Sequence, residues 1–76
     1  IVTGTIVEIS NEDLMIRTDE GILTIKKSEA TKYAVLSNDV NTQMHENELQ
    51  QNDEATIVVG VNSENEMTAI SVSVVR

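Results

Sequence analysis

Apolar and polar residues alternate with a period of two over most of the chain. In the stretch 5–9, Val7 and Ile9 lie on one side and Glu8 on the other, which is typical of a strand with one buried face. The pattern predicts a first strand over residues 2–10, with Val7 and Ile9 in the core. Residues 10–13 are polar and of types that favour a turn. The first strand is therefore expected to end in a hairpin.

Two further alternating runs extend that hairpin into a meander of three strands. Leu14, Ile16 and Thr18 alternate with the residues between them, which predicts a second strand. Gly21 can adopt a positive φ, so residues 19–21 predict another tight turn. Residues 22–27 follow as the third strand.

The middle of the chain carries a weaker pattern. Four apolar residues at 33–36 favour a short buried strand, although a helix would also fit them. Residues 37–54 are polar and predict a long connection with room for one or two helical turns packed over an end of the sheet. The apolar anchors of these turns are Val40, Met44 and Leu49, and the candidate N-caps are Asp39 and Asn41.

The last part of the chain returns to strict alternation. Over residues 55–61 every second residue is apolar, and Val58 is apolar as well, so this strand is expected to be central and covered on both faces. Gly60 in its interior predicts a bulge or a sharp bend. In the final run, the even-numbered residues of 69–74 are expected to face one way and the small odd-numbered residues the other.

Short strands joined by tight polar turns, with one longer connection after the third, match a small closed barrel of the OB type. We predict an all-β fold: an OB-like antiparallel barrel of roughly five to six strands, with a long polar connection before the last two. An open sandwich is the alternative. A chain of 76 residues forms only one domain, so residues 1–76 are expected to be a single module. Because the chain lacks an initiator methionine, we expect it to be a fragment of a longer protein or a processed chain.

Composition and charge remove several classes of function. The chain has one aromatic residue, no cysteine and a formal net charge of -8. Five cations cannot form a broad basic face, and one aromatic ring cannot supply stacking platforms for bases, so nucleic-acid binding is not expected. No apolar stretch reaches the roughly 18 residues of a spanning helix. Direct membrane insertion by this domain is therefore not expected either.

Few side chains could carry chemistry. His45 is the only histidine, and without a second histidine or a cysteine it cannot complete a typical zinc site. The paired carboxylates at 12–13, 19–20, 53–54 and 64/66 are expected to be solvated turn charges rather than glycosidase acids or calcium ligands. We predict no catalytic, cofactor-binding or metal-binding residue, and no cofactor. The candidates for ligand contact are Tyr33, as a single stacking platform, and Met44 and His45 in the polar connection.

Short turn-and-strand motifs follow one another in a fixed order along the chain. They are Thr3-Gly4-Thr5-Ile6, Asp19-Glu20-Gly21, Thr31-Lys32-Tyr33, Leu49-Gln50-Gln51-Asn52-Asp53, Ile57-Val58-Val59-Gly60 and Met67-Thr68-Ala69-Ile70-Ser71-Val72. In this order the chain resembles a bacterial OB-like family of unknown function found in secreted proteins, lipoproteins and envelope proteins. Asn52 stands where the family usually has glycine, and residues 38–47 look like an insertion. The resemblance implies a fold and an extracellular or envelope location, with no catalytic residues to transfer.

The sequence thus predicts a non-catalytic OB-like module of a bacterial secreted or cell-envelope protein, which is not an enzyme and acts as a spacer or protein-interaction domain. The expected partner is another protein or a neighbouring domain of the same chain, and a lipoprotein anchor is compatible with the resemblance. The alternative is an extracellular module that binds a small ligand, an oligosaccharide or Ca²⁺ through the loop 38–53.

Overall fold

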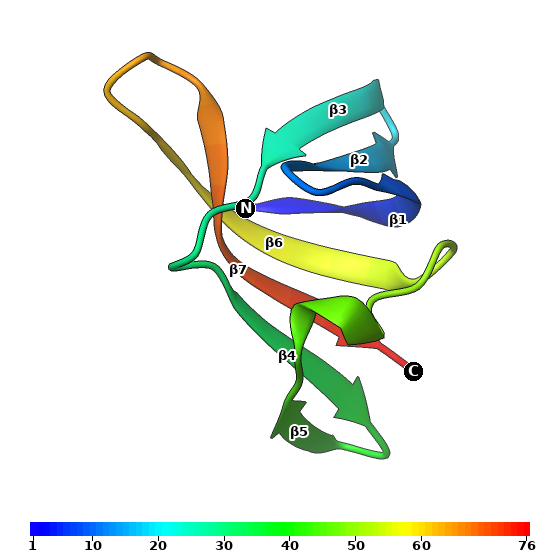
Figure 1. Cartoon of the computed structure of the whole chain (residues 1–76). Coiled ribbons are helices and arrows are strands. Elements are labelled where there is room, and N and C mark those ends of the chain that lie inside the picture. Colours follow the sequence, from blue (N-terminus) through cyan, green and yellow to red (C-terminus); the bar gives the residue numbers. More distant parts are fainter.

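The computed structural model describes residues 1–76 and is built almost entirely of β-strands (Figure 1). The elements are β1 (Val2–Ile9), β2 (Asp13–Thr18), β3 (Gly21–Lys26), β4 (Lys32–Ser37), β5 (Val40–Gln43), the 3₁₀ turn η1 (Glu46–Glu48), β6 (Glu54–Val61) and β7 (Met67–Val75). The strands follow the order β3-β2-β1-β6-β7-β4-β5 in one sheet, and β3 also contacts β7. No helix of the chain is long and apolar enough to span a bilayer.

Five of the strands close into a barrel. β1 pairs with β2 on one side and with β6 on the other, and β6 pairs with β7. The barrel closes where Lys26 of β3 lies opposite Thr68 of β7 in parallel orientation. This connectivity confirms the predicted all-β, OB-like barrel. β4 and β5 are additional strands that continue the sheet beyond β7.

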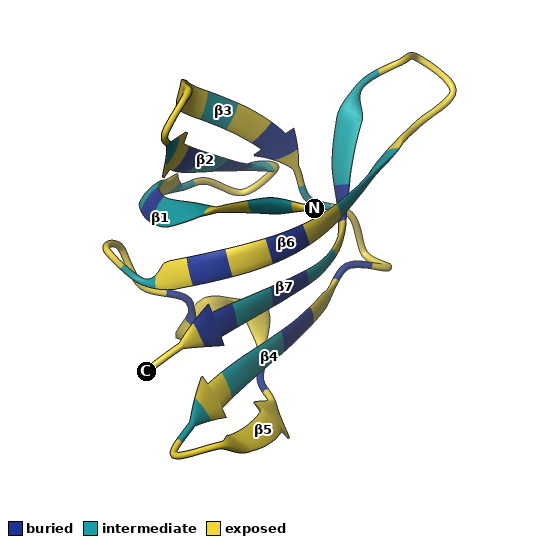
Figure 2. Cartoon of the chain, turned by 180° about the vertical axis from the view of Figure 1, so that it is seen from behind, coloured by how far each residue is buried: buried dark blue, intermediate teal, exposed yellow.

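Every barrel strand contributes buried aliphatic side chains to the interior, and Figure 2 marks the buried positions along the strands in dark blue. Gly4 allows β1 to approach β2 closely. A Cβ atom at this position would lie only 2.2 Å from the backbone oxygen of Arg17. Burying an isoleucine or leucine contributes roughly 1.5–3 kcal/mol. The largest fully buried side chains are Ile6, Leu14, Ile16, Ile25, Ile57, Val72 and Val74.

A β-bulge in β1 changes which residues face the core. Ile6 pairs with Ile16 and Glu8 pairs with Met15, so Val7 is an extra residue. One extra residue inverts the alternation of a strand. Ile6 is fully buried and Val7 is not, so the prediction that Val7 faces the core is wrong. Ile9, beyond the bulge, packs against the core as expected.

A second bulge lies in β7. The register with β6 shifts between Val58 and Val59, because Ile70 is an extra residue. Ile70 is 55% exposed while the preceding Ala69 is buried, which is the opposite of the predicted alternation at these two residues. The irregularity lies beside Gly60, where one was predicted, but the extra residue belongs to the partner strand. Its side chain covers Gly60, where a Cβ would lie 3.0 Å from Ile70 Cδ1.

β6 is central in the sheet, as predicted, with β1 and β7 as neighbours. Only one of its faces is covered, however. Ala55 and Ile57 are buried, whereas Val58 on the opposite face is 39% exposed and Val61 near the end of the strand is 68% exposed. The prediction that β6 is covered on both faces is therefore wrong. Beyond the barrel, β6 and β7 continue as a projecting hairpin (Figure 1).

The polar connection contains a strand that the sequence pattern did not reveal. Residues 40–43 form β5, which pairs antiparallel with β4. Asn38 and Asp39 have φ values of 52° and 64°, the left-handed pair that a tight two-residue hairpin turn requires. Asp39 and Asn41 are therefore not helix caps. Val40 is 61% exposed and is not a core anchor.

A single 3₁₀ turn follows β5, within the predicted one or two helical turns. Met44 and Leu49 flank η1 and are both buried, so these two predicted anchors hold it against the core. His45 is the N-cap. Its backbone N–H donates to Glu48 Oε2 at 2.9 Å, and the Glu48 N–H donates to the His45 carbonyl at 3.0 Å.

Candidate functional site

The sheet extension begins with β4, the strand predicted from the apolar run 33–36. β4 lies parallel to β7, and the pairs run from Lys32 opposite Ser71 to Leu36 opposite Val75. Because side chains alternate along a strand, Tyr33 shares the core face with Val72, and Lys32 and Ala34 lie on the outer face. The strand is therefore anchored by its inner side chains and presents Lys32, Ala34 and Leu36 on the outer face.

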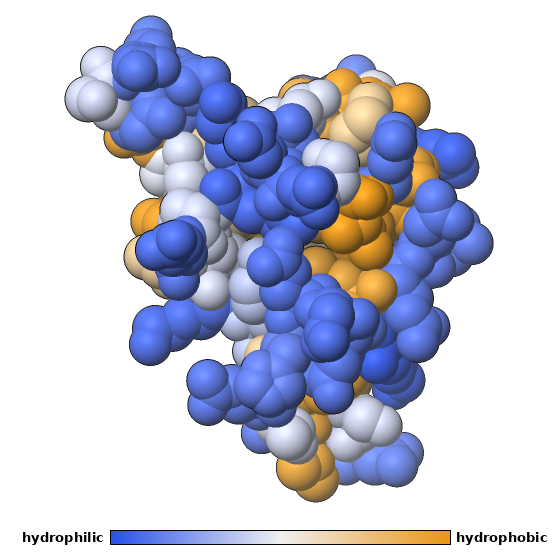
Figure 3. All heavy atoms as spheres, viewed as in Figure 1, coloured by the Kyte–Doolittle hydropathy of each residue, from blue (hydrophilic) through white to orange (hydrophobic).

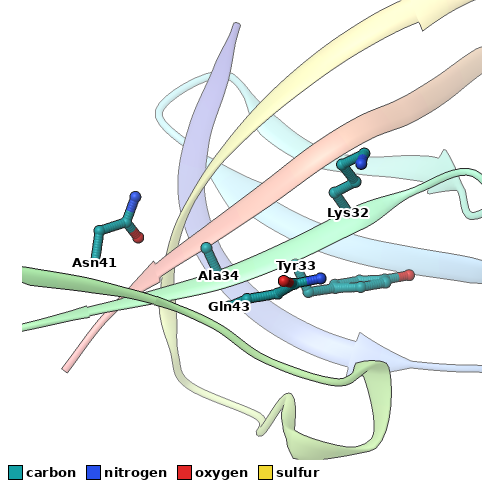
Figure 4. Close-up of a pocket in the computed structure, with 5 residues that line it drawn as sticks. All are labelled: Lys32, Tyr33, Ala34, Asn41 and Gln43. Atoms are coloured by element: carbon teal, nitrogen blue, oxygen red, sulfur yellow. The ribbon is translucent and has the colours of Figure 1, made fainter.

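A shallow hollow of about 270 Å³ lies beside the β4–β5 hairpin. Figure 4 shows Lys32 and Asn41 on the same side of the hairpin, with the Tyr33 ring running away from them. Lys32 forms no ion pair, so its ammonium group is available to a ligand. The hollow thus offers amide groups and one cation. Its lining residues are Lys32, Tyr33, Ala34, Asn41 and Gln43.

Tyr33 is a core residue at the floor of this region. The residue is only 8% exposed, and its hydroxyl group has no hydrogen-bond partner. Burial raises the pKa of the phenol, and the negative charge of Glu46 raises this pKa further. Little of the ring is exposed to a ligand outside, and the stacking role predicted for Tyr33 stays a prediction.

Met44 and His45, the other two candidates for ligand contact, lie outside the hollow. Met44 is buried, and its backbone N–H donates to the Tyr33 carbonyl at 3.0 Å. His45 is exposed at the start of η1. The structure therefore brings Tyr33 and Met44 together through the backbone and places the imidazole in solvent.

Two ion pairs fasten the polar connection to the rest of the fold. The Lys27 ammonium pairs with the Glu46 carboxylate, and the Lys27 side chain is only 5% exposed. Arg76 Nη2 donates to Asp53 Oδ2 at 2.8 Å and to the Glu48 carbonyl at 2.6 Å. The hydrogen bond with Asp53 raises the pKa of Arg76. Both ends of the segment that carries η1 are thus held by long-range contacts.

A third ion pair joins the projecting hairpin to β3. Lys26 Nζ lies 3.2 Å from Glu66 Oε2. The hydrogen bond to Glu66 raises the pKa of Lys26, whereas the hydrogen bond from Asn62 and then that from Lys26 lower the pKa of Glu66. Asn62 Oδ1 also accepts from the backbone N–H of Glu64 and of Glu66, each at 2.9 Å. These polar atoms of the 62–66 turn, one of the oxygen-rich loops weighed for calcium, are therefore engaged within the turn or by Lys26.

No three histidine or acidic side chains converge into a group that could hold a metal ion. The acidic residues of the chain lie mainly in turns and at strand ends, as the sequence indicated. Figure 3 shows the face that carries η1, which is largely hydrophilic. Carboxylates are therefore dispersed over the surface rather than gathered in one place.

The outer face of the sheet differs from that surface. Strand register places the outward residues of β1, β6, β7, β4 and β5 next to one another, and Figure 2 views the molecule from this side. Glu54 and Lys32 are the only charged residues among them, and most of the others are hydroxyl, amide or small apolar side chains. We call this surface the outer face; it consists of Thr3, Thr5, Lys32, Ala34, Leu36, Asn41, Gln43, Glu54, Thr56, Val58, Ser71, Ser73 and Val75.

Sequence reasoning did not find Lys32, Asn41 and Gln43 as neighbours. The available signal was the Asn38-Asp39 dipeptide, which favours a tight turn between two strands. A scan against protein-family models finds no match to the chain. Searches of curated proteins and of solved structures also find no match.

Proposed function

We propose that this chain is a non-catalytic protein-interaction module of a secreted or cell-envelope protein. The observation that carries the proposal is the separation of charge: on a domain of net charge -8, the outer face holds a single carboxylate, Glu54. Charged residues are depleted at the centres of protein interfaces, because desolvating them is costly. The outer face is therefore a surface that a protein can cover while desolvating few charges.

The bacterial envelope context rests on the resemblance in motif order. An acidic surface opposes docking on phosphate-rich partners such as nucleic acids and anionic lipids. The same surface favours partners with a positive charge. A protein partner or a neighbouring domain of the same chain fits both conditions.

A binding survey of the isolated domain against purified secreted and envelope proteins tests the proposal. Thr56→Glu places a carboxylate at the centre of the outer face and should weaken the affinity for a true partner by about tenfold or more, because that charge loses its water on binding. Ser63→Glu, at the exposed tip of the β6–β7 hairpin, is the matched control and should leave the affinity unchanged. Equal losses for both variants, or steady turnover of a substrate, would overturn the proposal.

A second candidate function is recognition of a small polar ligand or an oligosaccharide in the hollow beside β5. The hollow favours it by combining two amide side chains with the unpaired ammonium of Lys32. Calorimetric titration with cell-wall oligosaccharides tests this candidate, and Asn41→Ala should weaken the binding. For the calcium version of the same hypothesis, millimolar Ca²⁺ should raise the melting temperature by mass action. No heat signal with the sugars and no shift with calcium would remove both versions.

A further inference from the structure

The outermost strand of the sheet has a free edge. β5 is the last strand in the order of the sheet, and β4 is its only partner. All four of its residues are exposed. An exposed strand edge carries unpaired N–H and C=O groups and can pair with another extended chain.

The register identifies which backbone groups are free. Ser37 lies opposite Val40 next to the turn, and the Met44 N–H donates to the Tyr33 carbonyl. In an antiparallel pair, successive residues of a strand point their hydrogen-bonding groups alternately toward and away from the partner. Residues 40, 42 and 44 therefore bond to β4, and the N–H and C=O groups of Asn41 and Gln43 point outward.

Little protects this edge apart from its shortness. Natural edge strands are commonly guarded by lysine, by proline, by a bulge or by an inward-pointing charge. Residues Val40-Asn41-Thr42-Gln43 contain no charge and no proline, and the β4–β5 ladder has no register shift. A strand of this length spans about 13 Å, which matches an added segment of roughly four residues.

Charge argues for the chemistry of the occupant. Three of the thirteen carboxylates form ion pairs with cations of the domain, and the others are available to a partner. Along the chain, Asp39 precedes β5 and Glu48 follows it, and neither carboxylate forms an ion pair, whereas the carboxylate of Glu46 is paired with Lys27. A second copy of the domain would bring the same net charge of -8. Pairing through two short strands would also bury far less than the roughly 1,200 Å² of a stable interface.

We propose that the outer edge of β5 adds an extended cationic segment of another protein as a further strand, bonded to the main chain of Asn41 and Gln43. This inference rests on the proposed interaction function and specifies its partner. Side chains of the added strand that lie on the outer face would contact Asn41 and Gln43 and approach Lys32 across the hollow, so these positions should be neutral. The cations then belong at the alternate positions, on the opposite side of the sheet.

The test uses a blocked eight-residue peptide of alternating threonine and lysine as the probe. Its affinity for the domain should exceed that of the threonine–glutamate peptide by at least about tenfold. The same lysine peptide with alternate backbone amides N-methylated keeps the charge but cannot form a ladder, and it should lose at least about tenfold in affinity. Equal binding of the parent and N-methylated peptides would show that the attraction is only electrostatic and would overturn the proposal.

Variants of the domain give an independent check. Gln43→Pro removes an outward N–H and leaves the ladder with β4 in place, since proline is tolerated where the N–H faces solvent. The Gln43→Pro variant should bind the lysine peptide with an affinity lower by about tenfold or more. The Gln43→Thr variant should bind the peptide with the affinity of the unaltered domain. Asn41→Pro serves the same purpose if Gln43→Pro does not fold. Unchanged binding to the folded proline variants would overturn the proposal.

Two further outcomes separate this inference from the proposed function. A concentration-dependent dimer in sedimentation that the proline variants abolish would make a second copy the occupant, and the cationic segment would be wrong. If no peptide binds but Thr56→Glu still disrupts a purified protein partner, strand addition fails and the interaction function stands. If neither effect is seen, both fail together.

Discussion

The closed barrel and the β4–β5 extension belong to one sheet but are stabilised differently. Each barrel strand contributes at least one fully or nearly fully buried side chain, whereas every residue of β5 is exposed. The barrel strands are therefore defined by their core, and β5 is defined by its turn and by its ladder with β4. Local stability follows buried apolar contact, so the barrel should carry most of the folding free energy. The extension remains open to contacts with a partner.

The largest effect should come from truncating a barrel side chain. Leu14→Ala deletes a fully buried side chain and should lower the free energy of unfolding by about 2–5 kcal/mol. Val40→Ala in β5 shortens an exposed side chain and should change the free energy of unfolding by less than about 0.5 kcal/mol. Urea denaturation of both variants measures the difference. Similar losses at the two positions would mean that β5 is part of the core after all.

A smaller effect should come from the ion pair that fastens η1. Glu46→Gln removes the partner of the Lys27 ammonium, whose side chain is nearly buried. Because Glu46 itself is half exposed, solvent screening limits the loss to roughly 1–2 kcal/mol. Lys27→Met removes the buried charge and should cost less than Glu46→Gln. Hydrogen exchange should show the increased opening in residues 40–49, and equal opening of the barrel strands would contradict the division into two regions.

Tyr33 links the two regions, and its substitution should stabilise the protein. Tyr33→Phe removes a buried hydroxyl group without a partner and should raise the free energy of unfolding by about 1 kcal/mol. Thermal or urea denaturation at neutral pH gives this difference. A loss of stability would show that the hydroxyl makes a contact that matters.

The same residue predicts a pH dependence. The folded-state pKa of Tyr33 lies above its ordinary value, so the folded protein holds the phenolic proton more tightly than the unfolded chain. This contribution is fully present below pH of about 10 and is lost as the pH rises through the folded-state pKa. The melting temperature of the unaltered domain should therefore fall more steeply above pH of about 10 than that of Tyr33→Phe. Parallel profiles would contradict the assignment.

The smallest effect concerns the unpaired carboxylates. A net charge of -8 produces self-repulsion, which salt screens. Raising the salt concentration from about 20 to 200 mM should raise the melting temperature by roughly 2 °C, and the gain should be similar in the Val40→Ala variant. A melting temperature that falls with added salt would mean that the ion pairs outweigh the repulsion.

Alternation alone was enough to predict the barrel strands, because their periodicity is imposed by a buried face. It failed at Val7 and Ile70, since a bulge changes the side-chain order, and Gly60 marked only the neighbourhood of the second bulge and not the strand that contains it. It also failed at β5, whose four exposed residues have no inward face to impose a pattern. The hollow and the free edge follow from that hairpin, so they became visible only once the pairing of β4 with β5 was known.

The position of β7 determines when the domain can fold during synthesis. β7 completes the barrel against β3 and β6 and supports β4, yet it is the last strand of this segment. During synthesis the barrel formed by the earlier strands therefore cannot close until residues 67–75, which pair with β3 and β6, have left the ribosome. Acquisition of the native state should be late and cooperative, because loops of long sequence separation must be closed at that final step.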